Sequence, residues 1–298
     1  MRVWLLSHLV RSPGNRLMLE AAARLGVDMT LVEPGALSLR IGGAGLPPLG
    51  LYDQHGPLEL PARVLTRMGS SSPQRGFEVL RHLEAAGVPC INRAESLALA
   101  RDKVLTFQRL ACAGVPLPPT VVVGQQAPLE TLLAPLGPPP WVVKLPVAAQ
   151  GQGVALAESL PALRALLDLM EGLKQRALVQ HFVREAGGVD IRVLVVEGQA
   201  VAAMRRKAGP GEFRSNLHRG GAAEEVGIFP ALAEVAERAA RALDLTVAGV
   251  DLLPGGETPV VAEVNGSPGL EGLQAATSRD LAAELLTRLG FAAPPPPA

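Results

Sequence analysis

Apolar positions in the first third of the chain alternate between short continuous runs and stretches with helical spacing. The runs at 3–7, 29–32 and 64–67 are typical of buried strands, and the spacing over 15–25 and 76–86 predicts amphipathic helices. An order of strand, helix and strand favours a small α/β unit with a parallel sheet.

Turn-forming residues and a change of pattern mark the middle of the chain. Glycine and proline crowd the stretch 38–56, which we expect to form an irregular loop or a short hairpin. One long helix is expected over 95–113, ended by Gly114 and Pro116. The following segments predict an antiparallel sheet with two helices: strands at 120–123, 141–145, 154–157 and 178–183, and helices near 129–136 and 160–173.

Two hairpins and a helix are expected in the last third. The first hairpin pairs 191–196 with 200–205, and a helix follows over 229–243. The second pairs 247–253 with 260–265 across a stretch rich in turn formers. The proline-rich tail at 292–298 has no pattern of helix or strand and is expected to be disordered.

Composition narrows the class of protein. The 298 residues are 48% hydrophobic, which is enough for two or three compact units. Lys and Arg balance Asp and Glu at 28 each, so no global field favours nucleic acid or an anionic membrane, and any phosphate binding must be local. Cys90 and Cys112 have no metal or disulfide spacing, and no segment is typical of a signal peptide or membrane span. We expect a cytoplasmic protein.

Oxygen-bearing side chains gather at the second hairpin. Glu263 and Asn265 are two positions apart and share one face of a strand, and pairing of the hairpin brings Asp251 opposite them. Two carboxylates and an amide suit magnesium, which prefers oxygen ligands. Acidic residues beside a hairpin are also commonly just solvated, so this motif alone leaves both interpretations open.

Several residues further upstream are candidates for nucleotide contacts. Lys103 and Lys144 can neutralise phosphates, although either can also be a solvated lysine. The loop that contains Gly151 and Gly153 can bring backbone N–H groups to phosphate oxygens, or be an ordinary hairpin. The stretch 179–183 is either a buried strand or a segment between two lobes that reads the edge of a base.

A second group of candidates surrounds the first hairpin. Asp190 begins a strand where a carboxylate can accept bonds from ribose hydroxyls, and Arg192 follows on the same face. Cations and hydrogen-bond donors crowd the glycine-flanked stretch 205–221, which includes Arg214. The net-neutral background favours a phosphate- or carboxylate-binding loop over a merely solvated charged face.

Taken together, these motifs resemble the RimK-type glutamate ligases of the ATP-grasp fold. The resemblance rests on DIRVLVVEGQAVAAMRRKAGPGEFRSNLHRGG, on VAGVDLLPGGETPVVAEVNGSPGLEG, and on ARDK, WVVKLP and QGQGV upstream. It implies an N-terminal pre-ATP-grasp domain with a parallel sheet at 1–94, a central ATP-grasp lobe at 95–185 and a C-terminal lobe at 186–291. It also implies ATP and two magnesium or manganese ions between the lobes.

The resemblance implies roles for the candidate residues. Lys103 and Lys144 would contact phosphates, His181 and Phe182 the adenine, Asp190 the ribose, Arg214, Ser215 and Asn216 the terminal phosphate, and Asp251, Glu263 and Asn265 the metal ions. Catalysis would fall to Arg214, whose planar fork matches developing phosphoryl charge, with Arg192. The family usually has Glu-Tyr where this chain has His181 and Phe182.

The implied reaction is ATP-dependent carboxylate–amine ligation through an acyl phosphate. Glutamate would be the amine, and the C-terminal glutamate of a protein or peptide, such as a small-subunit ribosomal protein, would be the carboxylate. A homo-oligomer is expected, without direct contact to nucleic acid or membrane. Two alternatives remain open: a ligase for an amino-group carrier protein, small peptide or cofactor tail, and a non-catalytic nucleotide-binding regulatory module.

Overall fold

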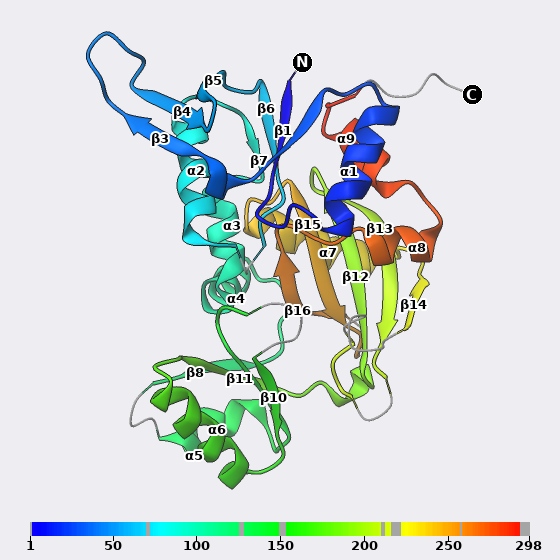
Figure 1. The fold of residues 1–298 in the computed structure, drawn as a ribbon. Helices are drawn as coiled ribbons and strands as arrows, with labels where there is room; N and C mark the ends of the chain where they lie inside the picture. Colours follow the sequence, from blue (N-terminus) through cyan, green and yellow to red (C-terminus); the bar gives the residue numbers. More distant parts are fainter. Residues whose placement is uncertain are drawn as a thin grey trace.

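The computed structural model describes residues 2–69, 72–124, 128–148, 153–209, 212–215, 222–256 and 258–292. Figure 1 shows an upper part built from both ends of the chain and a smaller lobe below it, coloured green. The parts are built around separate sheets. The fold is mixed α/β, with a parallel sheet near the N-terminus, as the sequence predicts. The domain limits at 94, 185 and 291 stay a prediction, and the tail from 293 onward lies outside the described residues.

The N-terminal sheet is parallel, in the order β2-β1-β6-β7. Its elements are β1 (Val3–Leu6), α1 (Pro13–Arg24), β2 (Met29–Val32), β6 (Arg63–Thr66), α2 (Gln74–Ala85) and β7 (Cys90–Ile91). Between β2 and β6 the chain forms a separate antiparallel sheet of β3 (Ser38–Ile41), β4 (Leu49–Asp53) and β5 (Gly56–Leu58). Of the two forms expected for 38–56, an irregular loop or a short hairpin, the structure has the hairpin, with a third strand added to it.

The expected helix over 95–113 is wrong as a single element. The chain forms α3 (Ala94–Arg101) and α4 (Lys103–Cys112), with Asp102 in an extended conformation between them. The carboxylate of Asp102 accepts hydrogen bonds from the N–H groups of Val104 and Leu105, so it caps the second helix. This break lets the N–H of Lys103 reach the carbonyl of Pro146 at 2.9 Å, which places Lys103 beside the central lobe.

The central lobe is an antiparallel sheet covered by helices on one face. Its strands run in the order β10-β9-β11-β8, and its elements are β8 (Thr120–Val123), α5 (Leu129–Leu133), β9 (Trp141–Lys144), β10 (Val154–Ala157), α6 (Leu160–Gly172) and β11 (Ala177–His181). Trp141, Val143 and Val179 point into the core under the helices. Because side chains alternate along a strand, Val142, Lys144 and Gln180 face the other way, toward the cavity described below.

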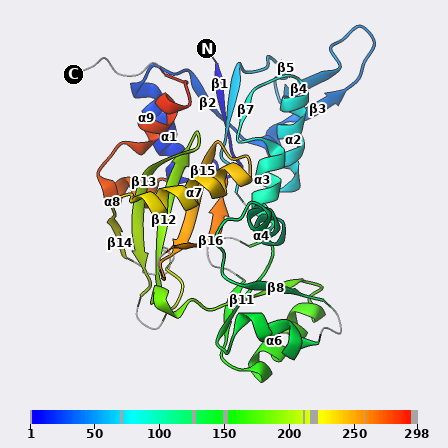
Figure 2. The ribbon, with the colours of Figure 1, turned by 180° about the vertical axis from the view of Figure 1, so that it is seen from behind.

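A five-stranded antiparallel sheet forms the C-terminal lobe, in the order β14-β13-β12-β15-β16. Its elements are β12 (Val189–Val196), β13 (Gln199–Lys207), β14 (Ala222–Glu225), α7 (Pro230–Ala242), β15 (Val247–Leu253), β16 (Val260–Asn265), α8 (Glu271–Thr277) and α9 (Leu281–Arg288). Figure 2 shows α7 across one face of this sheet. On the other face, Leu194 and Met204 share a core with Val3 and Met18, so the N-terminal domain packs directly on the large sheet.

Candidate active site between the central and C-terminal lobes

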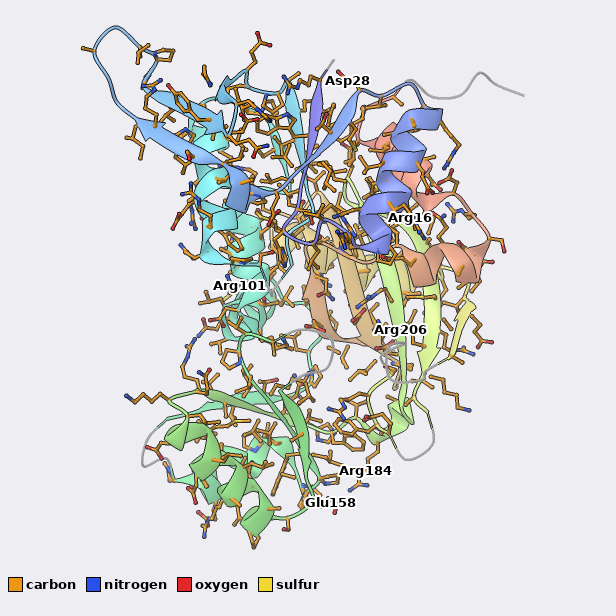
Figure 3. All side chains as sticks on the ribbon, viewed as in Figure 1. Arg16, Asp28, Arg101, Glu158, Arg184 and Arg206 are labelled. Carbon is orange, nitrogen blue, oxygen red and sulfur yellow. The ribbon has the colours of Figure 1, made fainter. Side chains whose placement is uncertain are left out.

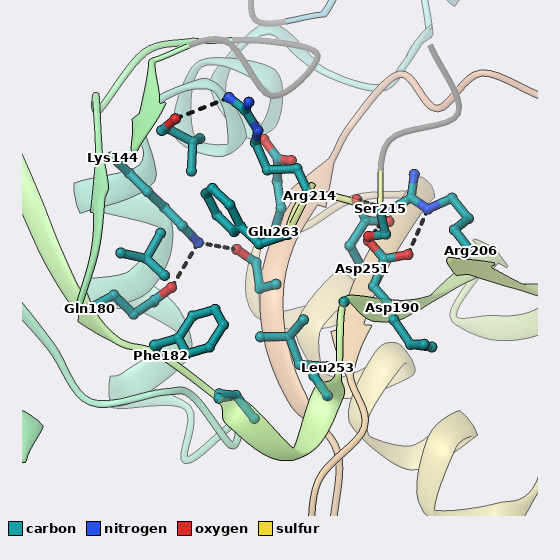
Figure 4. A pocket seen from close by; sticks show the side chains of 18 of the residues that line it. Lys144, Gln180, Phe182, Asp190, Arg206, Arg214, Ser215, Asp251, Leu253 and Glu263 are labelled. Carbon is teal, nitrogen blue, oxygen red and sulfur yellow. Dashed lines mark hydrogen bonds and ion pairs between the residues drawn. The ribbon is translucent and has the colours of Figure 1, made fainter. Parts of the chain in front are cut away.

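A cavity lies where the bare face of the central sheet meets the large sheet (Figure 4). The central lobe, the segment after β11 and four strands of the large sheet all contribute to it. Of the residues predicted from the sequence, Lys103, Lys144, His181, Phe182, Asp190, Arg214, Ser215, Asp251 and Glu263 line this cavity. The structure thus brings together residues that are up to 160 positions apart, from 103 to 263.

Lys144 projects from the end of β9 into the cavity. Its Nζ donates to Oε1 of Gln180 at 2.7 Å and to the carbonyl of Ala262 at 3.4 Å. That carbonyl is available because Ala262 lies at a bulge of β16, between the positions paired with Asp251 and Leu252. Burial lowers the pKa of Lys144 to about 8, against Glu263, which raises that pKa. A phosphate beside this ammonium would favour its charged form.

Lys103 and Glu263 form an ion pair across the wall of the cavity. The Nζ of Lys103 lies 3.2 Å from Oε1 of Glu263 and also donates to the carbonyl of Ala148 at 3.0 Å. Glu263 lies opposite Asp251 in the pairing of β16 with β15. The hairpin register expected from the sequence therefore brings the two carboxylates to adjacent strands.

Two arginines and two aspartates form a buried charge cluster, of which Asp190, Arg206 and Asp251 line the cavity and Arg192 does not. Arg206 donates from Nε and Nη2 to the carboxylate of Asp190, each at 2.6 Å, and its Nη2 lies 2.9 Å from Asp251. Arg192 makes an equivalent pair of 2.6 Å bonds to Asp251. We name Asp190, Arg192, Arg206 and Asp251 the charge cluster. Figure 4 shows Arg206 on the side of the cavity away from Lys144.

Ion pairing within the charge cluster changes the pKa values of its two carboxylates. Burial raises the pKa of Asp251, but Arg192 and Arg206 outweigh it and hold that pKa well below its usual range. Burial and the nearby Asp251 raise the pKa of Asp190, against hydrogen bonds from Arg206 and Ser215. Two guanidinium groups thus compensate two carboxylates in a space where Arg206 is only 3% exposed.

Arg206 and Gln180 are site residues that sequence reasoning did not assign to the site. Arg206 lies in a run of three cations, and β13 sends its neighbours Arg205 and Lys207 to the opposite, exposed face. Arg205 pairs there with Glu224 at 3.1 Å. The period of two along a strand is the signal that could have separated Arg206 from its neighbours.

Arg214 lies at the mouth of the cavity in a short described segment. Glu212 accepts from its Nε at 2.9 Å and from its Nη2 at 2.7 Å, and Nη1 donates to the carbonyl of Val154 at 3.1 Å. The hydrogen bond from Arg214 lowers the pKa of Glu212 to about 2. Beside it, Phe213 meets Phe182 edge to face at 6.4 Å between ring centroids, so two aromatic rings line one side of the cavity.

The backbone of His181 and its side chain point to different partners. Its N–H donates to the carbonyl of Pro119 at 2.9 Å, and its Nδ1 lies 2.8 Å from the carbonyl of Leu136, on the helix-covered side of the central sheet. Phe182, one position later, lies in the cavity (Figure 4). A group bound in the cavity would therefore meet the ring of Phe182 rather than the imidazole of His181.

The remaining predicted site residues lie elsewhere. Gly151 and Asn216 lie outside the described residues. Gly153 has φ +64°, and a Cβ there would come within 2.7 Å of Leu145, so this position requires glycine to close the loop after β9. Asn265 lines a second, smaller cavity that shares Lys103 and Glu263 with the first.

The chemistry of the donor set fits a hard divalent cation. Asp251, Glu263 and Asn265 offer oxygen atoms from two carboxylates and one amide. No group of three or more His, Cys, Asp and Glu side chains gathers anywhere in the part of the chain that the structure describes. These three residues alone would leave coordination positions for phosphate oxygens and water, as at magnesium sites that are shared with phosphate groups.

Known structures share this architecture of lobes. A crystal structure of a RimK domain ATP-grasp protein from Sphaerobacter thermophilus covers 99% of this chain and 100% of its own, with a TM-score of 0.73 and 24% identity. The ATP-grasp ligase PsnB, solved with a phosphomimetic variant of its minimal precursor, Mg and ADP, covers 97% of this chain and 98% of its own, with a TM-score of 0.74 and 17% identity. The fold is the ATP-grasp fold.

The protein belongs to the class of ATP-dependent ligases that form a carbon–nitrogen bond. Residues 100–289 match the RimK-like ATP-grasp domain and residues 1–97 match the RimK PreATP-grasp domain, so the chain belongs to the RimK family. A "Probable alpha-L-glutamate ligase 1" of Shewanella amazonensis is 38% identical over 302 residues, covering 98% of this chain and 96% of its own. A "Probable alpha-L-glutamate ligase" of Xanthomonas axonopodis pv. citri is 39% identical over 289 residues, with 97% of each chain covered.

Membership of a ligase family excludes the alternative of a purely regulatory nucleotide-binding module. Within the described ranges, no helix is both long and apolar enough to cross a membrane.

Proposed function

We propose that the protein joins the amino group of glutamate to the C-terminal carboxylate of a protein or peptide that ends in glutamate, at the cost of one ATP. The observation that carries this proposal is the convergence of Lys103, Lys144, Asp190 and Arg214 on one cavity beside two carboxylates. The names of the relatives, which are glutamate ligases, support glutamate as the substrate.

The lining of the cavity suggests how ATP binds. Phe182, Val142 and Leu253 offer apolar surface for the adenine, and the carboxylate of Asp190 can accept bonds from ribose hydroxyl groups. The ammonium groups of Lys144 and Lys103 also line the cavity and can neutralise the phosphates. The two hydrogen bonds from Arg206 fix the orientation of the Asp190 carboxylate before the nucleotide arrives.

Amide formation from a carboxylate requires activation of the carboxylate, because hydroxide is a poor leaving group. A carboxylate oxygen of the acceptor attacks the terminal phosphorus of ATP, the bond to the bridging oxygen breaks, and ADP leaves. The amine then attacks the carbonyl carbon of the acyl phosphate, and phosphate departs as the amide forms. Phosphoryl transfer depends mostly on positioning and charge neutralisation. The guanidinium of Arg214 can donate two parallel hydrogen bonds to the transferred phosphoryl group. To do so, it must share with that group the hydrogen bonds that it donates to Glu212.

The proposed site also includes two magnesium or manganese ions. Asp251, Glu263 and Asn265 would hold them, since these residues are the oxygen donors of the second hairpin. Bound divalent cations neutralise the charge of the phosphate groups during transfer. To accept a cation, Asp251 must share its carboxylate with Arg192 and Arg206, and Glu263 must share its own with Lys103.

A heavy-oxygen label in the acceptor tests the acyl-phosphate route. When the terminal carboxylate of a glutamate-ending peptide carries the label, one labelled oxygen should appear in each phosphate released, because the carboxylate oxygen leaves with phosphate. The measurement is the mass spectrum of the phosphate after reaction with ATP, magnesium and glutamate. A reaction without glutamate is the control. Product formed with unlabelled phosphate would contradict the proposed route.

A further inference from the structure

A second cavity adjoins the proposed nucleotide cavity. It has a volume of about 20 Å³, which is room for one or two water-sized groups and not for a nucleotide. Three parts of the fold enclose it: residues 68–69 after β6, the C-terminal end of α3, and residues 263–267 at the end of β16. Lys103 and Glu263 line both cavities, so a group bound in the small one lies beside the proposed site of phosphoryl transfer.

The charges around this small cavity do not balance. Lys103 and Glu263 compensate each other at 3.2 Å. Arg101, the last residue of α3, adds a second cation, and it makes no ion pair with any residue that the structure describes. Its guanidinium lies over the ring of Phe77, 5.5 Å from the ring centre, which holds the side chain without neutralising it. Figure 3 marks Arg101 beside α3 and α4.

Two further polar side chains line this small cavity. The hydroxyl of Ser267 and the side-chain amide of Asn265 make no hydrogen bond to another described residue. A hydroxyl, an amide and a guanidinium around a space of this size can all donate to a single carboxylate. A guanidinium is suited to that group because its fork can make two parallel bonds.

We propose that Arg101 binds a carboxylate of the acidic substrate in this small cavity. The inference rests on the proposed function and deepens it, since it assigns the recognition of the acid. The carboxylate has two possible sources, the incoming glutamate and the glutamate that ends the acceptor. Both present the same chemistry to the cavity, and a bound carboxylate of either would lie next to Glu263 and the proposed reaction centre.

Steady-state kinetics of three variants test this assignment. Arg101→Met removes the charge, Arg101→Lys keeps the charge without the fork, and Arg81→Met is the matched control, because Arg81 is an exposed arginine on the neighbouring helix α2 that lines neither cavity. In Arg101→Met the KM for glutamate or for the acceptor should rise about 10- to 100-fold, the size expected for a lost charge-assisted hydrogen bond. Arg101→Lys should lie between it and the wild type, and the KM for ATP should stay within about threefold.

Substrate analogues separate the two sources. Glutamine in place of glutamate, or an acceptor that ends in glutamine, replaces one side-chain carboxylate by an amide. If Arg101 binds the carboxylate that an analogue lacks, the wild type should have a higher KM for that analogue than for the natural substrate. Arg101→Met should have the same KM for both, because the substitution and the analogue remove the same contact. If the side-chain analogues leave both KM values unchanged, the contact is to an α-carboxylate. The α-amide of glutamate then gives the same kinetic comparison for the amine, and calorimetry gives it for the acceptor, whose α-carboxylate is the reacting group.

Direct measurements of ligand binding test the carboxylate site independently of the proposed reaction. Calorimetry of glutamate and of the acceptor peptide, each with magnesium and ADP present, reports affinity without turnover. If the wild type forms no amide but binds one of these ligands and Arg101→Met does not, the proposed function fails and the carboxylate site stands. If Arg101→Met matches Arg81→Met in both binding and KM, or raises only the KM for ATP, the carboxylate site is wrong.

Discussion

Replacing Glu263 by glutamine should lower the rate of amide formation at least about 100-fold while the protein stays folded. Glutamine keeps the size of the side chain and removes its charge, so the site loses a proposed metal ligand and Lys103 loses its ion-pair partner. The Glu263 side chain is 31% exposed, so the fold depends little on it. The measurement is kcat at saturating substrates, with circular dichroism as the check on folding.

Glu224→Gln provides the matched control for that experiment. Glu224 lies on β14 of the same large sheet and is ion-paired with Arg205, but it is exposed and lines no part of the nucleotide cavity. Its loss should change kcat less than about twofold. A Glu263→Gln enzyme with a rate within threefold of the wild type would contradict the role of Glu263.

Replacing Arg206 by methionine should destabilise the protein by about 3–5 kcal/mol, because Asp251 keeps Arg192 but the buried carboxylate of Asp190 loses its arginine partner. The same change should weaken nucleotide binding, since the orientation of Asp190 depends on the two bonds from Arg206. Urea unfolding measures the first effect, and calorimetry with ADP measures the second.

The neighbouring residue supplies the control for Arg206. Arg205→Met removes an exposed arginine from the opposite face of the same strand and should cost less than about 1 kcal/mol. Removing the charge of Asp190 as well, in Arg206→Met/Asp190→Asn, should recover part of the lost stability, because the uncompensated carboxylate is gone. Equal losses for Arg205→Met and Arg206→Met would mean that the charge cluster does not stabilise the fold.

Site residues could be predicted from the sequence where the pattern of a single strand or hairpin determines where their side chains lie. The hairpin spacing places Asp251 opposite Glu263, and the apolar run before Lys144 anchors that lysine at the end of a strand. These predictions need only pairing between neighbouring segments. They hold because strand pairing and side-chain alternation are local rules.

Contacts between distant segments could not be predicted in the same way. Asp190 and Arg206 lie opposite each other on the expected first hairpin, but the contact of Arg206 with Asp251 also requires β15 to lie beside β12, which the local pattern of the sequence does not reveal. Likewise, the apolar spacing over 95–113 is continuous, and the break at Asp102 follows from a capping bond and from the contact of Lys103 with Pro146. The side chain of His181 faces Leu136 because it alternates with Gln180, a consequence of the strand that the motif alone did not reveal.

The mass of the product tests the central claim most directly. Purified protein is incubated with ATP, magnesium, glutamate and a peptide that ends in glutamate, and the peptide is then examined by mass spectrometry. We predict a ladder of masses spaced by one glutamyl residue, because each addition leaves a new terminal carboxylate for the next. Omitting ATP should leave only the starting mass. A peptide whose mass stays unchanged with all substrates present, or that gains lysine as readily as glutamate, would contradict glutamate ligation.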